Sequence, residues 1–386
     1  MGFAAHPLWL VGFRPFFALA CLAGLSLPLL WVLLFLGVLP GPASAFPAMR
    51  WHAHEMFFGF GWAVLGGFLL TSTKNWVQIR GYHGALLIFL VAAWLIERAG
   101  MWFGGGWPSA LFEISSKLFL VSIVAMLVWT LVRHRKTDNY RDNYFFLLIL
   151  PAFLLAKHLM LSVDHFQAGV AMATGLFRVA FLVMLERTLT QFMKGIFQVD
   201  ILRHAALDRA IKLCALLLVG AGFMSPLPAA WLSLLLALLL AGRLLFWKPQ
   251  LALRRLDLGI MYLGYTAIVL QLLVEFLGQV AAPAWVGALS MHVFGLGAMG
   301  LIIPAMLIRI AKGHTGRKVV FDAGDKLVLW IMIAAFVLRV IAPQIHPRAY
   351  AVWLVLAACG WLAGFGILAV RLIPLLMQAR IDGKEH

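Results

Sequence analysis

Long apolar stretches alternate with short polar segments along almost the whole chain. A helix that spans the hydrocarbon core of a bilayer needs about 20 predominantly apolar residues. Backbone polar groups find no other partner in that core, so a spanning run of this length is expected to be helical. The pattern predicts twelve such helices, at residues 16–38, 53–72, 84–103, 111–132, 143–163, 167–189, 207–224, 227–246, 258–279, 284–308, 326–343 and 349–376.

The composition agrees with a chain whose surroundings are mostly lipid. Of the 386 residues, 63% are hydrophobic and 12% are charged, whereas a soluble domain is about one quarter charged. Too few polar side chains are present to cover a surface that faces water. We therefore predict an all-α, polytopic transmembrane bundle of about 12 helices. It is expected to form a single domain over residues 1–386, with the lipid bilayer as its surroundings.

Basic residues fall in alternate loops between the predicted helices. Apart from Arg50 and Arg348, loop Lys and Arg residues concentrate in five connections, at 73–83, 133–142, 190–206, 247–257 and 309–325. Cytoplasmic loops carry such an excess of basic residues, so both termini are predicted to be cytoplasmic. The net charge of +16 is thereby explained as a topology signal. Nucleic acid is not expected as a partner.

The segment Trp51–Met56 places two imidazoles, a carboxylate and a thioether at the mouth of an apolar helix. Ionisable groups persist beside hydrocarbon mainly where they have a partner, and His, Glu and Met all bind metals or heme. On a regular helix His52 and His54 point roughly 200° apart, so they are not expected to bind one centre together. His52 and Met56 share a face, with Glu55 beside them. These four residues are candidate metal ligands, and a solvated helix cap is the alternative.

His292 is a second candidate ligand, about two turns inside the predicted helix 284–308 and followed by several glycines. Small residues permit close helix packing or the approach of a flat macrocycle. Helices 53–72 and 284–308 both run from outside to inside, which puts His54 and His292 at a similar depth. Two axial ligands of one heme need matching depth. We therefore hypothesise a heme held by His292 and by His54 or His52.

Other polar side chains lie within the predicted helices. His158 is a candidate ligand of a second metal centre, and a packing histidine bonded to a backbone carbonyl is the alternative. Arg178 lies deep in its helix and is expected to have a partner, either a carboxylate or a heme propionate. Glu186 and Arg187 lie near the inner end of the same helix, where they are expected to snorkel toward water.

Three blocks of sequence have a specific order and spacing. They are Gly12–Phe17 before the first helix, Trp51–Met56 with Gly67–Thr71 and Asn75-Trp76, and His292 with its glycines, running on to Arg309 and Gly313–Arg317. In these blocks the chain resembles the NnrS family of bacterial inner-membrane proteins. Leu185–Phe192 departs from the family pattern, which has a glycine- and proline-containing run there.

The resemblance implies a heme protein, with copper also possible, located in the bacterial inner (cytoplasmic) membrane and linked to nitric oxide metabolism or tolerance. It favours a role for His314 in contact with a cofactor or a quinol, with a structured turn as the alternative. Arg14, Arg50 and Arg178 complete the candidate cofactor-binding residues. The chain has no CxxCH motif, so the heme is expected to be b-type and not covalently attached.

Three functional hypotheses follow. The first is a nitric oxide reductase-like oxidoreductase that reduces NO at a heme or heme–copper site near the periplasmic side, with electrons from a quinol. Neutral NO enters lipid readily, which suits a site inside the membrane. The second is a non-catalytic heme or copper binder, acting as a sensor, store or assembly factor. The third, less favoured, is a metal-free secondary transporter, which metal content would separate from the other two.

Overall fold

The computed structural model describes residues 3–43, 46–140 and 143–384. Within these ranges every regular element is helical, as the hydropathy pattern predicts. Eleven helices are long and apolar enough to cross a membrane, and each overlaps one of the twelve predicted spans. The all-helical membrane fold is thus confirmed. The remaining predicted span, 207–224, consists of the shorter helix α8 (Ala205–Leu217) and the 3₁₀ helix η7 (Leu218–Phe223).

The described residues group into two compact units. Unit 1 comprises residues 1–161, 307–320 and 365–386, and unit 2 comprises residues 162–306 and 321–364. Two helices, α13 (Gly300–His314) and α16 (Tyr350–Met377), begin in unit 2 and end in unit 1. That the whole chain forms one domain stays a prediction.

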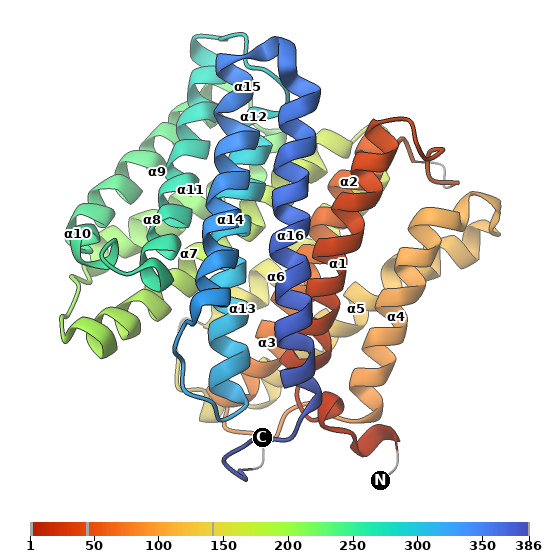
Figure 1. The fold of residues 1–386 in the computed structure, drawn as a ribbon, viewed down its shortest axis with the longest axis vertical. Coiled ribbons are helices and arrows are strands. Elements are labelled where there is room, and N and C mark those ends of the chain that lie inside the picture. The colour runs from red at the N-terminus through yellow and green to blue at the C-terminus, as the bar shows by residue number, and fades with distance from the viewer. Residues whose placement is uncertain (1–2, 44–45, 141–142, 385–386) are drawn as a thin grey trace. The chain divides into compact units, whose positions relative to one another are not determined.

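Unit 1 contains most of the N-terminal helices, drawn from red to yellow in Figure 1. In chain order these are α1 (Phe13–Phe35), α2 (Ala48–His54), the π-helix η3 (Glu55–Gly61), α3 (Trp62–Trp76), α4 (Ala85–Phe103), α5 (Ser109–Arg133) and α6 (Tyr144–Leu161). α1 packs closely on α3 because Gly67 has no side chain; a Cβ there would lie 2.8 Å from the Cβ of Phe16. The α1 backbone is also tied to α3, since the Phe13 amide donates to the Thr71 hydroxyl at 2.9 Å.

Unit 2 contains α7 (Phe166–Phe197), α8, η7, α9 (Pro226–Phe246), α10 (Pro249–Ala252), α11 (Leu256–Val280), α12 (Leu289–His292), the π-helix η8 (Val293–Met299), α14 (Ala323–Val340) and α15 (Ala342–Ile345). α9 and α11 lie side by side and are joined by buried tyrosines. Tyr265 donates to the Leu240 carbonyl at 3.0 Å, and Tyr262 donates to the Trp247 carbonyl at 2.8 Å. These bonds satisfy hydroxyls that could otherwise find no partner in an apolar core.

Candidate functional site

His54 is the last residue of α2 and is followed at once by a π-helix, Glu55–Gly61. The helix then resumes α geometry as α3. Single π-turns inside α-helices are rare and occur frequently at functional sites. A π-turn holds an extra residue, so it rotates the side chains before it relative to those after it. The sequence pattern gave no signal of this feature.

The His54 ring is buried, with one nitrogen bound and the other unbound. Its side chain is 2% exposed, and Nδ1 lies 2.9 Å from Oε1 of Glu55. Glu55 also forms an ion pair with Arg98, and an ionised carboxylate only accepts hydrogen bonds, so Nδ1 of His54 carries the proton and Nε2 carries the lone pair. The buried Nε2 has no hydrogen-bond partner. Metal-binding histidines are commonly arranged in this way, with the ring nitrogen opposite the metal donating to a carboxylate.

Glu55 begins a chain of buried charges that reaches α6. Its Oε2 lies 2.8 Å from Nε of Arg98, close enough for an ion pair although the N–H is not aimed for a hydrogen bond. Arg98 in turn donates to Glu97, and Lys157 Nζ lies 2.5 Å from Oε1 of the same carboxylate. Both carboxylates and the lysine are at most 3% exposed. Removing one partner from such a set would leave an uncompensated buried charge, which is costly.

Glu97 and Arg98 are not among the residues predicted from the sequence, although a signal for them is present. Two adjacent ionisable residues stand inside the otherwise apolar stretch 84–103, and intramembrane charges are rare and usually functional. His158, beside the buried Lys157, is exposed. Its role as a ligand of a second metal centre stays a prediction.

Other residues in and beside the Trp51–Met56 segment have different surroundings from those of His54. His52 stacks on Trp31, with ring centroids 4.5 Å apart and planes 15° apart. His54 instead lies 5.3 Å from the ring of Phe58. Arg50 and Met56 are half-buried. The structure therefore gives the two histidines separate surroundings, as their spacing on the helix predicts.

His292, in unit 2, repeats the local arrangement of His54. It is the last residue of α12, and the π-helix η8 follows it directly. Nδ1 lies 2.7 Å from the Ala288 carbonyl, so it donates and Nε2 again carries the lone pair. Here, however, Nε2 accepts a hydrogen bond from Nη2 of Arg339 at 3.2 Å. The same Nη2 lies 3.0 Å from the Tyr350 hydroxyl.

Arg178 has the carboxylate partner that its depth requires. Its Nη2 lies 3.4 Å from both oxygens of Glu275. Gln271 also donates to Glu275, and its amide lies 3.2 Å from the Ser290 hydroxyl. Arg178 Nε is buried without a hydrogen-bond partner. A role in binding a cofactor stays a prediction for Arg178.

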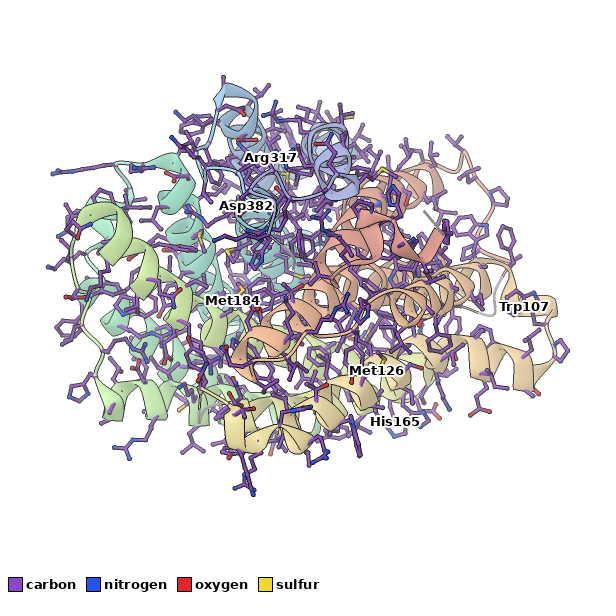
Figure 2. The ribbon with its side chains drawn as sticks, turned by 90° about the horizontal axis from the view of Figure 1, so that it is seen from below. Trp107, Met126, His165, Met184, Arg317 and Asp382 are labelled. Carbon is purple, nitrogen blue, oxygen red and sulfur yellow. The ribbon has the colours of Figure 1, made fainter. Side chains whose placement is uncertain are left out.

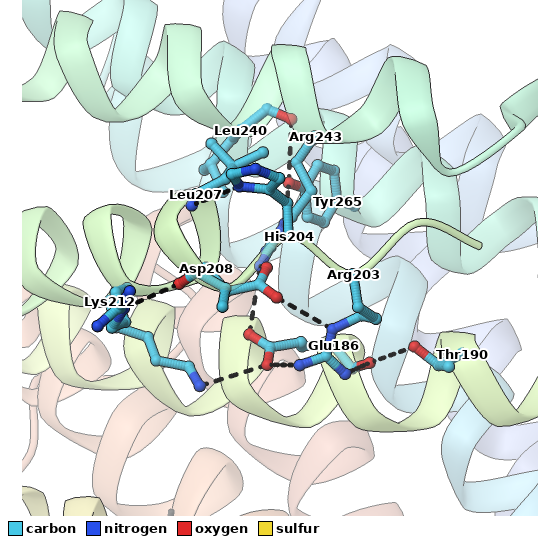
Figure 3. A network of polar contacts seen from close by, with 12 residues as sticks. Glu186, Thr190, Arg203, His204, Leu207, Asp208, Lys212, Leu240, Arg243 and Tyr265 are labelled. Carbon is cyan, nitrogen blue, oxygen red and sulfur yellow. Dashed lines mark hydrogen bonds and ion pairs between the residues drawn. The ribbon is translucent and has the colours of Figure 1, made fainter.

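Glu186 does not extend toward water. It is buried on α7 at the centre of the polar network in Figure 3, where Arg203, Lys212 and Arg243 all approach its carboxylate. Arg243 Nη1 lies 3.3 Å from Glu186 Oε2 and 3.4 Å from Oδ1 of Asp208. The network joins α7, α8 and α9 through buried ion pairs. The expectation that Glu186 snorkels is therefore wrong.

Arg14 and His314 lie together at one end of unit 1. Arg14 is fully buried, and its Nη1 donates to the backbone carbonyls of Leu376 and Gln378 at 2.8 and 2.5 Å. The rings of Phe13 and His314 lie 5.4 Å apart, centroid to centroid. Two of the sequence blocks, far apart along the chain, are thus close in space.

The described residues contain no group of three or more His, Cys, Asp or Glu side chains placed to hold a metal ion. Copper therefore stays a prediction, as does its ligation by His52, Glu55 or Met56. His54 and His292 belong to different units. Their pairing as axial ligands of one heme also stays a prediction.

A search of curated proteins finds no match for this chain. A family model described as NnrS protein matches residues 7–380. The match covers all three blocks that carry the resemblance and both histidines that precede π-helices. The chain belongs to the NnrS family.

Proposed function

We propose that this protein binds heme in the membrane and reduces nitric oxide there with electrons from a quinol. The observation that carries this proposal is the Nε2 atom of His54, buried and without a hydrogen-bond partner. An unsatisfied lone pair in an apolar interior is costly unless a ligand occupies it. Membership of the NnrS family supports heme as that ligand.

The residues around His54 suit an iron-bound imidazole. Glu55 fixes the tautomer and the ring orientation through Nδ1, and such a carboxylate also raises the basicity of the ligating nitrogen. Arg98 holds the Glu55 carboxylate from its other side. A bound heme would supply a redox-active iron that coordinates NO.

The neighbouring side chains keep the site dry and its charges paired. Phe58 covers one side of the His54 ring, and the ammonium of Lys157 lies 5.6 Å from the Phe58 ring centroid. Reduction of NO also consumes protons, and the chain Lys157–Glu97–Arg98–Glu55 connects α6 to the His54 ring through buried polar atoms. Nitric oxide is uncharged and enters lipid readily, so a site within the helices is accessible to it.

His292 is proposed as a second ligand whose availability depends on Arg339. While Arg339 donates to Nε2, that lone pair is occupied. Gly295, three residues further along, has open space where its side chain would be. A flat macrocycle could approach this face of the helix once the arginine moves away.

The first test is an optical difference spectrum, reduced minus oxidised, of the purified protein before and after addition of NO. We expect heme bands that shift with NO, a pyridine adduct typical of b-type heme, and heme that acidified acetone extracts. The His54→Ala variant should lose these bands. His83→Ala removes an exposed imidazole of the same unit and should keep them. A protein that inserts normally but carries no heme would contradict the proposal.

Turnover then separates a reductase from a non-catalytic binder. The purified protein in liposomes receives a reduced quinol and NO, and NO consumption is followed with an electrode. We expect consumption that depends on both the quinol and His54. A heme spectrum that responds to NO without consumption would favour a sensor or store instead.

A further inference from the structure

Basic side chains gather at the end of unit 1 where α1 begins and where α3, α13 and α16 end. Arg14 lies in the first turn of α1, and Lys74 lies in the last turn of α3. Arg317 follows α13 and Arg380 follows α16. Figure 2 shows Arg317 close to Asp382, in the segments that follow these two helices. We call these four basic residues the basic cluster.

Short contacts hold the basic cluster together. The guanidinium of Arg317 donates from Nη2 to the Gln378 side-chain oxygen at 2.7 Å, and Arg14 donates to the backbone carbonyl of the same residue. Arg380 Nη1 donates to the His314 carbonyl at 3.1 Å. The segments after α13 and α16 are further joined by a backbone bond from Ile381 to Thr315. The cluster is therefore a built feature of the fold.

Among residues 3–43, 46–140 and 143–384, the positive charge of the cluster exceeds the negative charge paired with it. Arg317 and Arg380 both repel Arg14 electrostatically, and Arg380 also repels Lys74. Among the described residues, Asp382 is the one carboxylate that forms an ion pair with the cluster, and it does so with Arg380. Hydrogen bonding to Arg380 holds the pKa of Asp382 below its ordinary range, so it contributes one negative charge. Within the part of the chain that the structure describes, four cations thus face one paired anion.

Attraction to the C-terminal ends of helices explains the position of only some of these basic side chains. The C-terminal carbonyls of a helix carry partial negative charge and attract basic side chains. Arg14 and Arg380 are placed in this way, because Arg14 donates to a carbonyl at the end of α16 and Arg380 donates to one at the end of α13. Arg317 is not, since its Nη1 is buried without a hydrogen-bond partner. A buried, unsatisfied guanidinium nitrogen beside three other cations indicates that an acceptor is missing.

We propose that the basic cluster binds a phosphate-bearing anion between the ends of these helices. Arginine recognises phosphate oxygens through paired N–H donors, and lysine adds a point charge. The cluster lies where membrane-spanning helices end, which is the level of lipid headgroups. Basic pockets between helices at this level bind anionic headgroups. The phosphodiester of an anionic phospholipid and free inorganic phosphate are the two sources of this chemistry.

The test measures thermal unfolding of the purified full-length protein in a neutral detergent. Phosphatidylglycerol, phosphatidylcholine and inorganic phosphate are each titrated. Arg317→Gln and Lys74→Gln remove cluster charges, and Arg133→Gln and Lys136→Gln remove exposed charges of the same unit as matched controls. We expect phosphatidylglycerol to raise the melting temperature of the wild type and of both controls. Arg317→Gln should bind about tenfold more weakly, because one charge-assisted contact is lost.

The outcomes separate the two sources and can overturn the proposal. Stabilisation by phosphatidylglycerol but not by inorganic phosphate identifies a lipid headgroup, and stabilisation by both identifies a general phosphate site. The proposal fails if neither anion stabilises the protein, or if Arg317→Gln and Arg133→Gln respond alike. Heme absorbance serves as an independent readout: loss of heme in Arg317→Gln with an unchanged response to both anions would assign the cluster to the cofactor instead.

Discussion

His54 and His292 stand in matching local structures and differ at one atom. Each ends an α-helical turn, precedes a seven-residue π-helix and donates from Nδ1. The acceptor is the carboxylate of Glu55 in one case and the backbone carbonyl of Ala288 in the other. Nε2 of His54 has no partner, whereas Nε2 of His292 accepts from Arg339.

In both places the local helix geometry orients an imidazole in the same way. The side chains that contact the ring then determine whether its Nε2 atom is available to a ligand. A π-turn and an anchored Nδ1 are common to both sites. A carboxylate behind the ring strengthens the ligand, and an arginine in front of it occupies the lone pair. His54 therefore is the stronger candidate for a permanent ligand.

The largest difference in heme content is expected between two variants, in each of which one of the two histidines is replaced by alanine. His54→Ala should remove nearly all heme absorbance, because no other imidazole on this helix has its surroundings. His292→Ala should retain most of the absorbance, since its lone pair is engaged by Arg339. Heme per protein, measured by pyridine adduct, decides the matter. Equal losses in the two variants would instead support an axial pair.

A smaller effect is expected at Glu55, the acceptor that His292 lacks. Glu55→Gln keeps an oxygen near Nδ1 but removes the charge, so heme affinity should fall about 10- to 100-fold, as for other outer-shell partners of metal-binding histidines. Competition with apomyoglobin for heme measures this. Glu113→Gln removes an exposed carboxylate of the same unit and should leave heme affinity unchanged.

Freeing His292 should make it behave more like His54. Arg339→Gln removes the charged donor to Nε2, so reaction of His292 with diethyl pyrocarbonate should become about tenfold faster. Mass spectrometry of peptides follows the labelling. Arg339→Lys keeps a charged donor and should react nearly as slowly as the wild type. Arg348→Gln, at an exposed arginine, should show no acceleration.

The smallest effect concerns two glycines, Gly67 in the helix that follows η3 and Gly295 in η8. Gly67→Ala in α3 would place a Cβ 2.8 Å from the Cβ of Phe16, and such overpacking costs about 1–3 kcal/mol. Gly295→Ala in η8 meets open space and should not lower the melting temperature. Thermal unfolding in detergent compares the two. Similar losses of stability would contradict the difference in packing.

The sequence predicted the helices well because a spanning segment must be long and apolar, and this property is local. At 207–224 it predicted one long helix, whereas the structure has the shorter helix α8 followed by η7. There Asp208 pairs with Arg203, and Lys212 pairs with Glu186. The candidate ligand His54 was identified by its chemistry. Its surroundings were not, because Arg98 and Lys157 come from helices distant in sequence and the π-turn has no hydropathy signal.

The π-helices also make the direction of the histidine side chains sensitive to the loss of a single residue. A π-turn amounts to one residue inserted into an α-helix, and each residue of an α-helix turns the chain by about 100°. Loss of a single residue between Glu55 and Gly61 would therefore swing His54 away from its present direction while leaving the span long enough to cross the membrane. A chain that lacked one residue here would thus keep its span but not the direction of the His54 ring, so the length of this segment controls where that imidazole points.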